Sequence, residues 1–379
     1  MDNRLKIISQ VKRIVIKIGS SVLGSLDNGL NKDSIQNLAQ GVAELRQKGY
    51  EVLMVSSGAV LAGRKHMGLK EKPVDIPLKQ AAASVGQTKL MQAYEEAFAR
   101  HGLKVGQILL TRDDISHRRR YLNARNTLFT LLRYGVVPII NENDTVTVEE
   151  IKLGDNDNLS ALVTGLVGAD LLIILSDVEG LCTGNPFEDK AARLIHTVRR
   201  FTPKLYGLAG QHNSQVSAGG MGTKLQAAQK AVSSGAHAII ACGHKLDILA
   251  QIMDGEEVGT LFLSCPAPLT SRKQWIAHAV HPRGVLKVDA GAREALVRDG
   301  KSLLPSGILA VEGKFNAGDA VSLAGPDGRE FAKGLTNYQA HEVQQIQGLK
   351  TGEIEKRLGY KYYDEIIHRD NLVIIDTNK

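Results

Sequence analysis

Cysteine is scarce in this sequence, with three among 379 residues (Cys182, Cys242 and Cys265). They are far apart and odd in number, which excludes a disulfide framework and a Cys-x-x-Cys metal pattern. No apolar run approaches the roughly 20 residues needed to cross a bilayer. The first residues also lack the apolar region of a signal peptide. We therefore expect a reduced, cytoplasmic protein without a membrane segment.

Excess positive charge is confined to one part of the chain. The formal net charge is +7, which invites a nucleic-acid-binding interpretation. Residues 280–379 carry 14 Lys and Arg against 14 Asp and Glu, so the whole excess belongs to residues 1–279. Part of it is the run Arg118-Arg119-Arg120, which is typical of a solvated face. The neutral C-terminal part argues against strong binding to a nucleic-acid backbone, although a local basic patch stays an open alternative.

Apolar strands and helical segments alternate over the first two-thirds of the chain. Continuous Val, Ile and Leu runs between helices indicate a mostly parallel sheet that is covered on both faces. We therefore predict an α/β fold with three layers, helices on a sheet on helices. The predicted strands are 14–18, 52–55, 105–110, 136–140, 171–175 and 238–241, and the predicted helices are 33–48 (with Asp33 as N-cap), 78–100, 121–133, 159–167 and 223–234.

The pattern changes after Thr260, as expected of a chain long enough for two domains. Cys265-Pro266-Ala267-Pro268 is typical of a linker. Shorter segments with turn signals such as Pro326-Asp327-Gly328 follow and predict a small, mainly β module. The predicted boundaries are 1–265 for the α/β domain, 266–280 for the linker, 281–366 for the β module and 367–379 for a C-terminal tail.

Four predicted strands end in small or polar residues. In parallel sheets, ligands bind beyond the carboxyl ends of the strands, so we predict that these four corners share one site. The run Gly154-Asp155-Asn156-Asp157-Asn158 precedes an apolar helix and is expected at a further polar corner. The four corners are Lys17-Ile18-Gly19-Ser20-Ser21, Ser56-Ser57-Gly58-Ala59, Asn141-Glu142-Asn143-Asp144 and Ser176-Asp177.

Two lysines stand beside glycine-rich turns, as a phosphate site requires. Lys17 precedes Gly19-Ser20-Ser21, and Lys224 closes the loop Ala218-Gly219-Gly220-Met221-Gly222-Thr223-Lys224. The order Gly-Thr-Lys in that loop excludes a Walker A motif. Two such cations suit phosphoryl transfer from a nucleotide, which depends on positioning and charge stabilisation. A carboxylate such as Asp157 between them would hold both in place and keep them protonated.

Five stretches of the chain resemble, in the same order, the motifs of the amino acid kinase family. They are residues 15–21, 56–59, 141–144, 154–162 and 218–224. The segments 80–90, 106–111 and 258–262 extend the resemblance, which covers about residues 10–265. The remainder resembles a PUA domain. Within the family the match is closest to members that phosphorylate the side-chain carboxylate of L-glutamate with ATP, giving γ-glutamyl phosphate for proline synthesis. The resemblance therefore implies this reaction.

The resemblance also implies roles for individual residues. Lys17 and Lys224 would stabilise the transferring phosphoryl group, with Asp157 as their organiser. L-glutamate would be held by Ser57, Asp144 and Asn156, with Asn141 as a further candidate. Mg2+ is expected to bridge the ATP phosphates, and no metal-binding residues are assigned. The implied ATP-binding residues are Lys17, Gly19, Ser176, Asp177, Ala218, Gly219, Gly220, Met221, Gly222, Thr223 and Lys224.

Partners and alternatives complete these expectations. The resemblance implies feedback inhibition by L-proline and a homo-oligomer, either a dimer or a tetramer. One alternative is a kinase of the same fold that acts on N-acetylglutamate, aspartate or a nucleoside monophosphate. An acetylated substrate has no ammonium group to pair with Asp144, which favours free glutamate. The other alternative is an RNA-binding or RNA-modifying protein, because PUA modules are common in such proteins.

Overall fold

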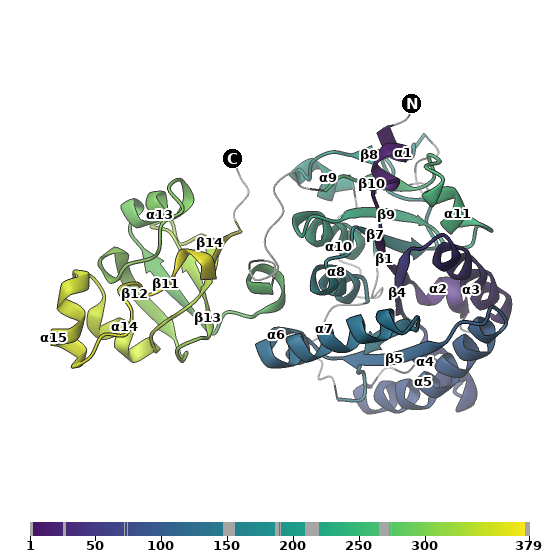
Figure 1. Ribbon diagram of the computed structural model, residues 1–379, viewed down its shortest axis with the longest axis horizontal. Helices are drawn as coiled ribbons and strands as arrows, with labels where there is room; N and C mark the ends of the chain where they lie inside the picture. The colour runs from purple at the N-terminus through teal and green to yellow at the C-terminus, as the bar shows by residue number, and fades with distance from the viewer. Residues whose placement is uncertain are drawn as a thin grey trace. The chain divides into compact units, whose positions relative to one another are not determined.

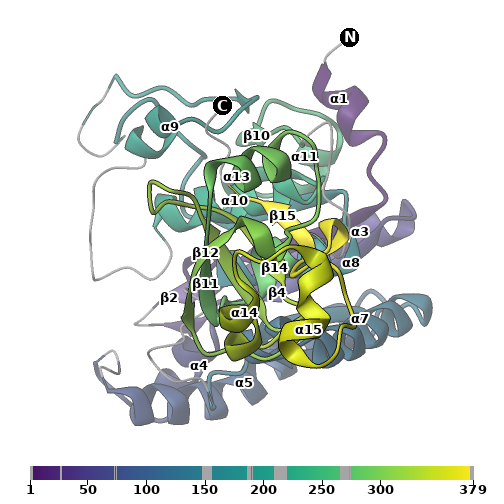
Figure 2. The same cartoon turned by 90° about the vertical axis from the view of Figure 1, so that its left-hand side faces the viewer.

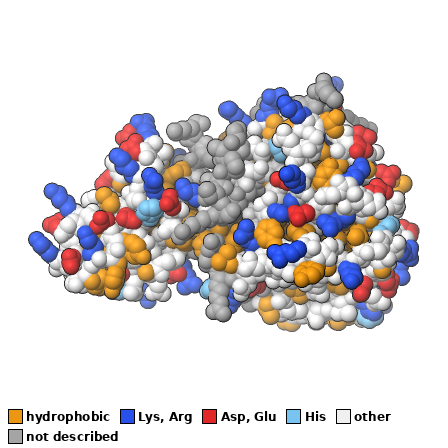
Figure 3. Space-filling model, in the orientation of Figure 1, with side chains coloured by type: hydrophobic (Ala, Val, Ile, Leu, Met, Phe, Trp, Pro, Cys, Tyr) orange, Lys and Arg blue, Asp and Glu red, His pale blue; other side chains and the backbone are white. Residues whose placement is uncertain are grey.

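The computed structural model describes residues 3–25, 28–71, 73, 75–146, 156–185, 189, 191–208, 220–264, 273 and 275–375 (Figure 1). The chain divides into two compact units, Met1–Pro268 and Leu269–Lys379. Within the described ranges, no helix combines the length and the apolar character that a membrane span needs. On the face that Figure 3 shows, basic and acidic side chains are interspersed.

An eight-stranded sheet organises the first unit, in the order β5-β6-β4-β1-β7-β9-β10-β8. All neighbouring strands are parallel except β9 and β10, so the predicted mostly parallel sheet is confirmed. The strands are β1 (Arg13–Ile18), β4 (Glu51–Ser56), β5 (Val105–Leu110), β6 (Val137–Glu142), β7 (Leu171–Ser176), β8 (Thr197–Val198), β9 (His237–Cys242) and β10 (Thr260–Phe262).

Helices cover both faces of this sheet, which confirms the predicted three layers (Figure 1). One face carries α7 (Arg118–Arg133), α8 (Asn156–Val167) and α10 (Met221–Ser233). The opposite face carries α2 (Ser20–Leu23), α3 (Lys32–Gln47), α5 (Ile76–Ala99) and α11 (Ile248–Met253), with α4 (Ala59–His66) against α5. Smaller elements are α1 (Asn3–Ile8), β2 (Gly24–Ser25), β3 (Gly29–Leu30), α6 (Arg112–Ser116) and α9 (Pro203–Leu208).

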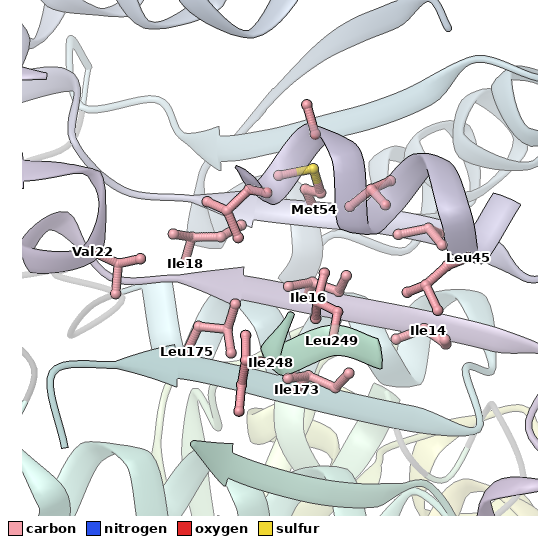
Figure 4. Close-up of a cluster of buried hydrophobic side chains, with 14 of the residues drawn as sticks. Ile14, Ile16, Ile18, Val22, Leu45, Met54, Ile173, Leu175, Ile248 and Leu249 are labelled. Carbon is pink, nitrogen blue, oxygen red and sulfur yellow. The ribbon is translucent and has the colours of Figure 1, made fainter. Parts of the chain in front are cut away.

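The central strand β1 sends alternate side chains to the two faces. Ile14, Ile16 and Ile18 are fully buried in the core on the α3 side. Figure 4 shows them beside Met54 of β4, Ile173 and Leu175 of β7, and Leu45, Ile248 and Leu249 from the helices. By this alternation Lys17 points to the opposite face, toward α8. The apolar packing of β1 therefore fixes the direction of its one lysine.

The five predicted helices begin one to three residues earlier than predicted, at Lys32, Ile76, Arg118, Asn156 and Met221, and the caps of α3 and α5 explain two of these differences. The side chain of Asn31, not Asp33, caps α3, and its Oδ1 accepts hydrogen bonds from the backbone N–H groups of Asp33 (3.0 Å) and Ser34 (3.1 Å). Because the helix begins at Lys32, Asp33 lies in the first turn, where a carboxylate is also favourable. Helix α5 begins before Leu78, because Asp75 caps it and proline is tolerated in a first helical turn.

Helices α4 and α5 contact each other through their backbones. A Cβ atom built on Gly63 of α4 would lie 1.7 Å from the carbonyl oxygen of Ala82. One built on Gly86 of α5 would lie 1.7 Å from the carbonyl oxygen of Ala59. No side chain fits at either position, so these two glycines fix how the helices pack.

The second unit is a five-stranded sheet in the order β12-β11-β13-β14-β15, with short helices around it (Figure 2). The predicted mainly β module is confirmed. Its elements are β11 (Gly284–Val288), α13 (Ala290–Val297), β12 (Ile308–Gly313), β13 (Ala320–Ala324), β14 (Glu330–Leu335), α14 (Ala340–Ile346), α15 (Ile354–Leu358) and β15 (Leu372–Ile374), with short turns η2 (Trp275–Ala279), η3 (Pro305–Gly307), η4 (Thr351–Glu353) and η5 (Arg369–Asn371).

The structure differs from the predicted boundaries at both ends of this unit. Residues 372–374, which we assigned to a tail, form β15 and pair with β14. Leu372 and Val373 are buried there, so they form part of the apolar packing at this edge of the sheet. Residues 275–279 of the predicted linker form the π-helical turn η2 against β14 and β15, with Trp275 and Ile276 buried. Residues 266–272 and 274 of that linker lie outside the described residues.

Candidate active site

The four polar corners lie at one edge of the sheet. Strands β6, β4, β1 and β7 are consecutive neighbours and run parallel. Ile18 at the end of β1 is level with Ser56 of β4 and Leu175 of β7. The carboxyl ends of these strands therefore place their corners side by side, where open α/β sheets bind ligands.

Asp157 of α8 lies between two lysine ammonium groups. Its Oδ1 is 2.6 Å from Nζ of Lys17, and its Oδ2 is 3.4 Å from Nζ of Lys224. The hydroxyl of Thr223 also reaches Oδ2, at 2.9 Å. Asp157 is fully buried, and each lysine is 4% exposed. The three charged groups come from β1, α8 and α10, so the fold brings together residues that are far apart in the sequence.

This cluster brings two ammonium groups to one carboxylate. Burial by itself raises the pKa of Asp157, but the ammonium groups of Lys17 and Lys224 outweigh it and hold that pKa below its ordinary value. Asp157 is therefore ionised and pairs with both ammonium groups. Two ammonium groups that are held close together attract anions. The cluster is thus suited to an anionic ligand such as a phosphate.

The polar run before α8 differs in part from its predicted form. Asn156 and Asp157 belong to the first turn of the helix rather than to a turn before it. A carboxylate at this position is favourable, because the N-terminus of a helix carries partial positive charge. Gly154 and Asp155, which belong to the same run, lie outside the described residues.

Two backbone features beside the lysines suit a phosphate group. Gly19 donates its N–H to Leu175 O (3.0 Å), and a Cβ built on Gly19 would lie 3.8 Å from Nζ of Lys17. Gly220 is the N-cap residue of α10, and no side chain caps that helix start in the described part of the chain. The N–H groups of a first helical turn, which includes Met221, Gly222 and Thr223 here, commonly bind anions. Ala218 and Gly219 lie outside the described residues.

Ser176 is the last residue of β7, and Asp177 follows it. The hydroxyl of Ser176 donates to Oδ1 of Asp177 at 2.9 Å, and the N–H of Gly243 donates to Ser176 O at 2.8 Å. Ser176 is buried, whereas Asp177 is exposed. The pair therefore combines a fixed strand end with a carboxylate that faces solvent.

The side-chain amide of Asn156 hydrogen-bonds to residues at two neighbouring corners. Its Nδ2 is 3.1 Å from Ser56 O, 3.0 Å from Ser57 Oγ and 2.9 Å from Asn141 Oδ1. Its own Oδ1 is buried and has no hydrogen-bond partner among the described residues. Ser57, Asn141 and Asn156 thus form one polar cluster, next to Asp157 in the sequence, that offers an unused acceptor.

Asp144 stands two residues beyond β6 and is half-buried. Burial raises the pKa of its carboxyl to about 6. Within the described residues no hydrogen bond joins Asp144 to the Asn156 cluster. It is a carboxylate that titrates close to neutral pH and is available to a cationic group.

Two residues of helix α5 support these corners, and sequence reasoning missed both. Asn141 Nδ2 donates to Gln87 Oε1 at 2.9 Å, and the hydroxyls of Tyr94 and Ser56 are 2.8 Å apart. A glutamine and a tyrosine in an amphipathic helix are typical of ordinary packing. The only signal was that Gln87 falls within the segment 80–90 that resembles the family.

Comparison with known proteins gives two family matches. The model of the amino acid kinase family matches residues 12–242, and the PUA domain model matches residues 284–358. A protein named glutamate 5-kinase from Geobacter sulfurreducens is 56% identical over 372 residues, covering 98% of this chain and 100% of that protein. The glutamate 5-kinase of Syntrophotalea carbinolica is 54% identical over 371 residues, covering 98% and 99%. Among solved structures, carbamate kinase from Giardia lamblia bound to AMP-PNP matches with 17% identity and a TM-score of 0.48, covering 68% of this chain and 100% of that one.

Proposed function

Because the chain belongs to the amino acid kinase family, we propose that it transfers a phosphoryl group from ATP to the side-chain carboxylate of L-glutamate. The products are L-glutamyl 5-phosphate and ADP, and the reaction is the first step of proline biosynthesis. The observation that carries the proposal is the Lys17–Asp157–Lys224 cluster, which adjoins the Asn156 cluster at one sheet edge.

The two lysines supply most of the catalysis. A carboxylate oxygen of glutamate attacks the γ-phosphorus, and the bond from that phosphorus to the bridging oxygen of ADP breaks. The attacking group is already ionised, so the step needs no general base. Negative charge spreads over the transferring oxygens in the transition state, where Lys17 and Lys224 stabilise it. Asp157 contacts both ammonium groups and holds them in place.

The Asn156 cluster and Asp144 bind the amino acid. Ser57 Oγ accepts a hydrogen bond from Asn156, which leaves the Ser57 hydroxyl hydrogen for a carboxylate of the substrate. The buried Oδ1 of Asn156 accepts from a donor such as the ammonium group. Asp144 pairs with the same cationic end. An N-acetylated substrate lacks this charge, so the site favours free glutamate.

ATP fits the cationic side of the site. The two ammonium groups of the lysine cluster, the glycine corner at Gly19 and the start of α10 all suit phosphates. Ser176, Asp177 and the segment 218–224 complete the nucleotide site. Mg2+ would shield the charge of the ATP phosphates and so ease the approach of the carboxylate.

One assay tests this function. Purified protein is incubated with Mg-ATP, hydroxylamine and, separately, glutamate, N-acetylglutamate, aspartate and a nucleoside monophosphate. Acyl phosphates react with hydroxylamine, so a hydroxamate that forms with glutamate alone supports the proposal. Hydroxamate from N-acetylglutamate or aspartate instead, or ADP release with the nucleotide only, would replace glutamate as the substrate.

The remaining expectations are proposals that follow from the same assignment. L-proline added to the assay inhibits the enzyme, the chain assembles into dimers or tetramers in sedimentation experiments, and it works in the cytoplasm. RNA binding by the PUA domain is tested by gel shift with tRNA at two salt concentrations. Binding that persists at the higher salt would favour a specific RNA partner.

A further inference from the structure

Helix α5 contacts two of the corners that form the Asn156 cluster. Gln87 bonds to Asn141 at the end of β6, and Tyr94 bonds to Ser56 at the end of β4. The two residues are seven positions apart, which places them two helical turns apart on the same face of α5. A single rigid element therefore supports both corners from behind.

The amide of Asn141 has only one orientation that satisfies its neighbours. The backbone N–H of Glu142 donates to Asn141 Oδ1 at 2.9 Å, so this side of the amide must be the oxygen. Asn141 Nδ2 then donates to Gln87 Oε1, and Asn156 Nδ2 donates to the same Asn141 Oδ1. The carbonyl of Ser56, which can only accept, also faces Asn156 Nδ2. The chain of amides thus points the oxygen of Asn156 away from the cluster, as a free acceptor.

A second chain of hydrogen bonds fixes the backbone at Ser57. The Ser56 hydroxyl donates to Ser57 O at 2.9 Å, so the Tyr94 hydroxyl is the donor in its contact with Ser56. Tyr94 is fully buried, and this burial raises the pKa of its hydroxyl far above the ordinary value. The hydroxyl therefore stays protonated, and can donate, at and well above neutral pH.

The position of α5 is itself fixed beside these residues. Gly86, which precedes Gln87, lies against the backbone of α4 at Ala59. Helix α4 begins directly after Ser57 and Gly58. A shift of α5 would consequently move the start of α4 as well as both supported corners.

We propose that Gln87 and Tyr94 are positioning residues that set the affinity for the acidic substrate, acting through Asn141 and Ser56. The inference rests on the proposed function, since it assigns the Asn156 cluster to the amino acid. Neither residue hydrogen-bonds to Lys17, Asp157 or Lys224 in the described structure. Their loss therefore weakens substrate binding and leaves the phosphoryl-transfer step nearly unchanged.

The test compares Gln87→Met and Tyr94→Phe with the wild-type chain. Each variant keeps the side-chain volume but removes one buried hydrogen-bonding group, so KM for glutamate should rise about tenfold. Both kcat and KM for ATP should stay within about twofold. Gln92→Met is the matched control, because Gln92 lies on the same helix, is exposed and bonds only to Glu96 among the described residues. It should leave all three constants unchanged.

A double-mutant cycle separates positioning from direct contact. If Gln87 acts through Asn141, then Gln87→Met should change KM for glutamate by less than about twofold in an Asn141→Ala background. A full tenfold effect in that background would mean that Gln87 contacts the substrate itself and would overturn the inference. Should Gln87→Met unfold below the assay temperature, Gln87→Ala, which leaves room for a water, takes its place.

Two other results would also overturn the inference. One is an unchanged KM in Gln87→Met and Tyr94→Phe, and the other is a fall in kcat as large as the rise in KM. The cycle is run with whichever acid the wild-type chain phosphorylates. Failure of glutamate in the panel thus refutes the proposed substrate, while the constants for the true substrate still decide the role of α5.

Discussion

Lys17 and Asp157 form a buried ion pair with 2.6 Å between Nζ and Oδ1, although one lies on the central strand and the other on a helix that covers it. Packing on the other face of β1 decides this contact. Because Ile16 and Ile18 are in the core on the α3 side, the side chain between them is directed at α8. The alternation of side chains along β1 therefore sets the position of this charged cluster.

Removal of either lysine should abolish most turnover. Lys17→Met and Lys224→Met each delete a cation that faces the transferring oxygens, and we expect kcat to fall by about 10²–10³. Lys230→Met is the control, because Lys230 also lies on α10 and donates to a side chain of α8, Asn158, at 2.7 Å. Steady-state kinetics and circular dichroism give the readout. A comparable loss in the Lys230 variant would show that the helix contact, and not the charge, matters.

Asp157→Asn should destabilise the protein and make it more responsive to anions. The change leaves two buried ammonium groups without their carboxylate, at a cost of about 3 kcal/mol of unfolding free energy. Inorganic phosphate should then raise the melting temperature of the variant by more than that of the wild-type chain. Thermal unfolding with and without phosphate measures both effects. Equal shifts in the two proteins would contradict an anion site at this cluster.

Asp144 should make substrate binding depend on pH. Burial raises its pKa to about 6, so protonation below that value removes the charge that pairs with the ammonium group. We expect KM for glutamate to rise as the pH falls through 6, while Asp144→Asn gives a higher and pH-independent KM. A profile that keeps its slope in the variant would assign the titration to another group.

Asp144 should also make the free energy of unfolding depend on pH. The direction is opposite to that expected of a carboxylate that is paired with a cation. The pKa of Asp144 is higher in the folded chain than its ordinary value of 3.8, so the folded state binds the proton more tightly. The contribution of Asp144 to the free energy of unfolding is therefore present at low pH and is lost as the pH rises from about 4 to 6. Denaturant melts across this range should show that Asp144→Asn gains stability relative to the wild-type chain as the pH rises.

Gly86→Ala should separate the two helices that flank the substrate corners. The added methyl group would overlap the carbonyl oxygen of Ala59, and overpacking of this kind costs about 1–3 kcal/mol. Gly207→Ala on α9 is the control, since a Cβ there meets nothing within 4 Å among the described residues. Urea unfolding compares them. An unchanged free energy of unfolding in the Gly86 variant would mean that α4 and α5 can move apart at little cost.

The charged residues proposed for the site could be picked out from the sequence because each lies next to an apolar segment at a glycine or polar corner. Their convergence is also physical, since parallel strands end at one edge. Gln87 and Tyr94 could not be found in this way, because a helix residue acquires such a role only through the corner that it packs against. Strand β15 was missed for a similar reason. Leu372–Ile374 is three residues long, and its pairing with β14 comes from a distant part of the chain.

Asn156 and Asp157 are consecutive residues of α8, a helix in which nearly every side chain is buried. Successive helical side chains diverge by about 100°, so one residue can reach the corner that holds the acceptor while the next reaches the lysines. In the proposed site, one short piece of backbone therefore carries both the residue assigned to the amino acid and the residue that orients the lysines. A movement of α8 would shift both side chains together, so the distance between the two bound reactants would change little.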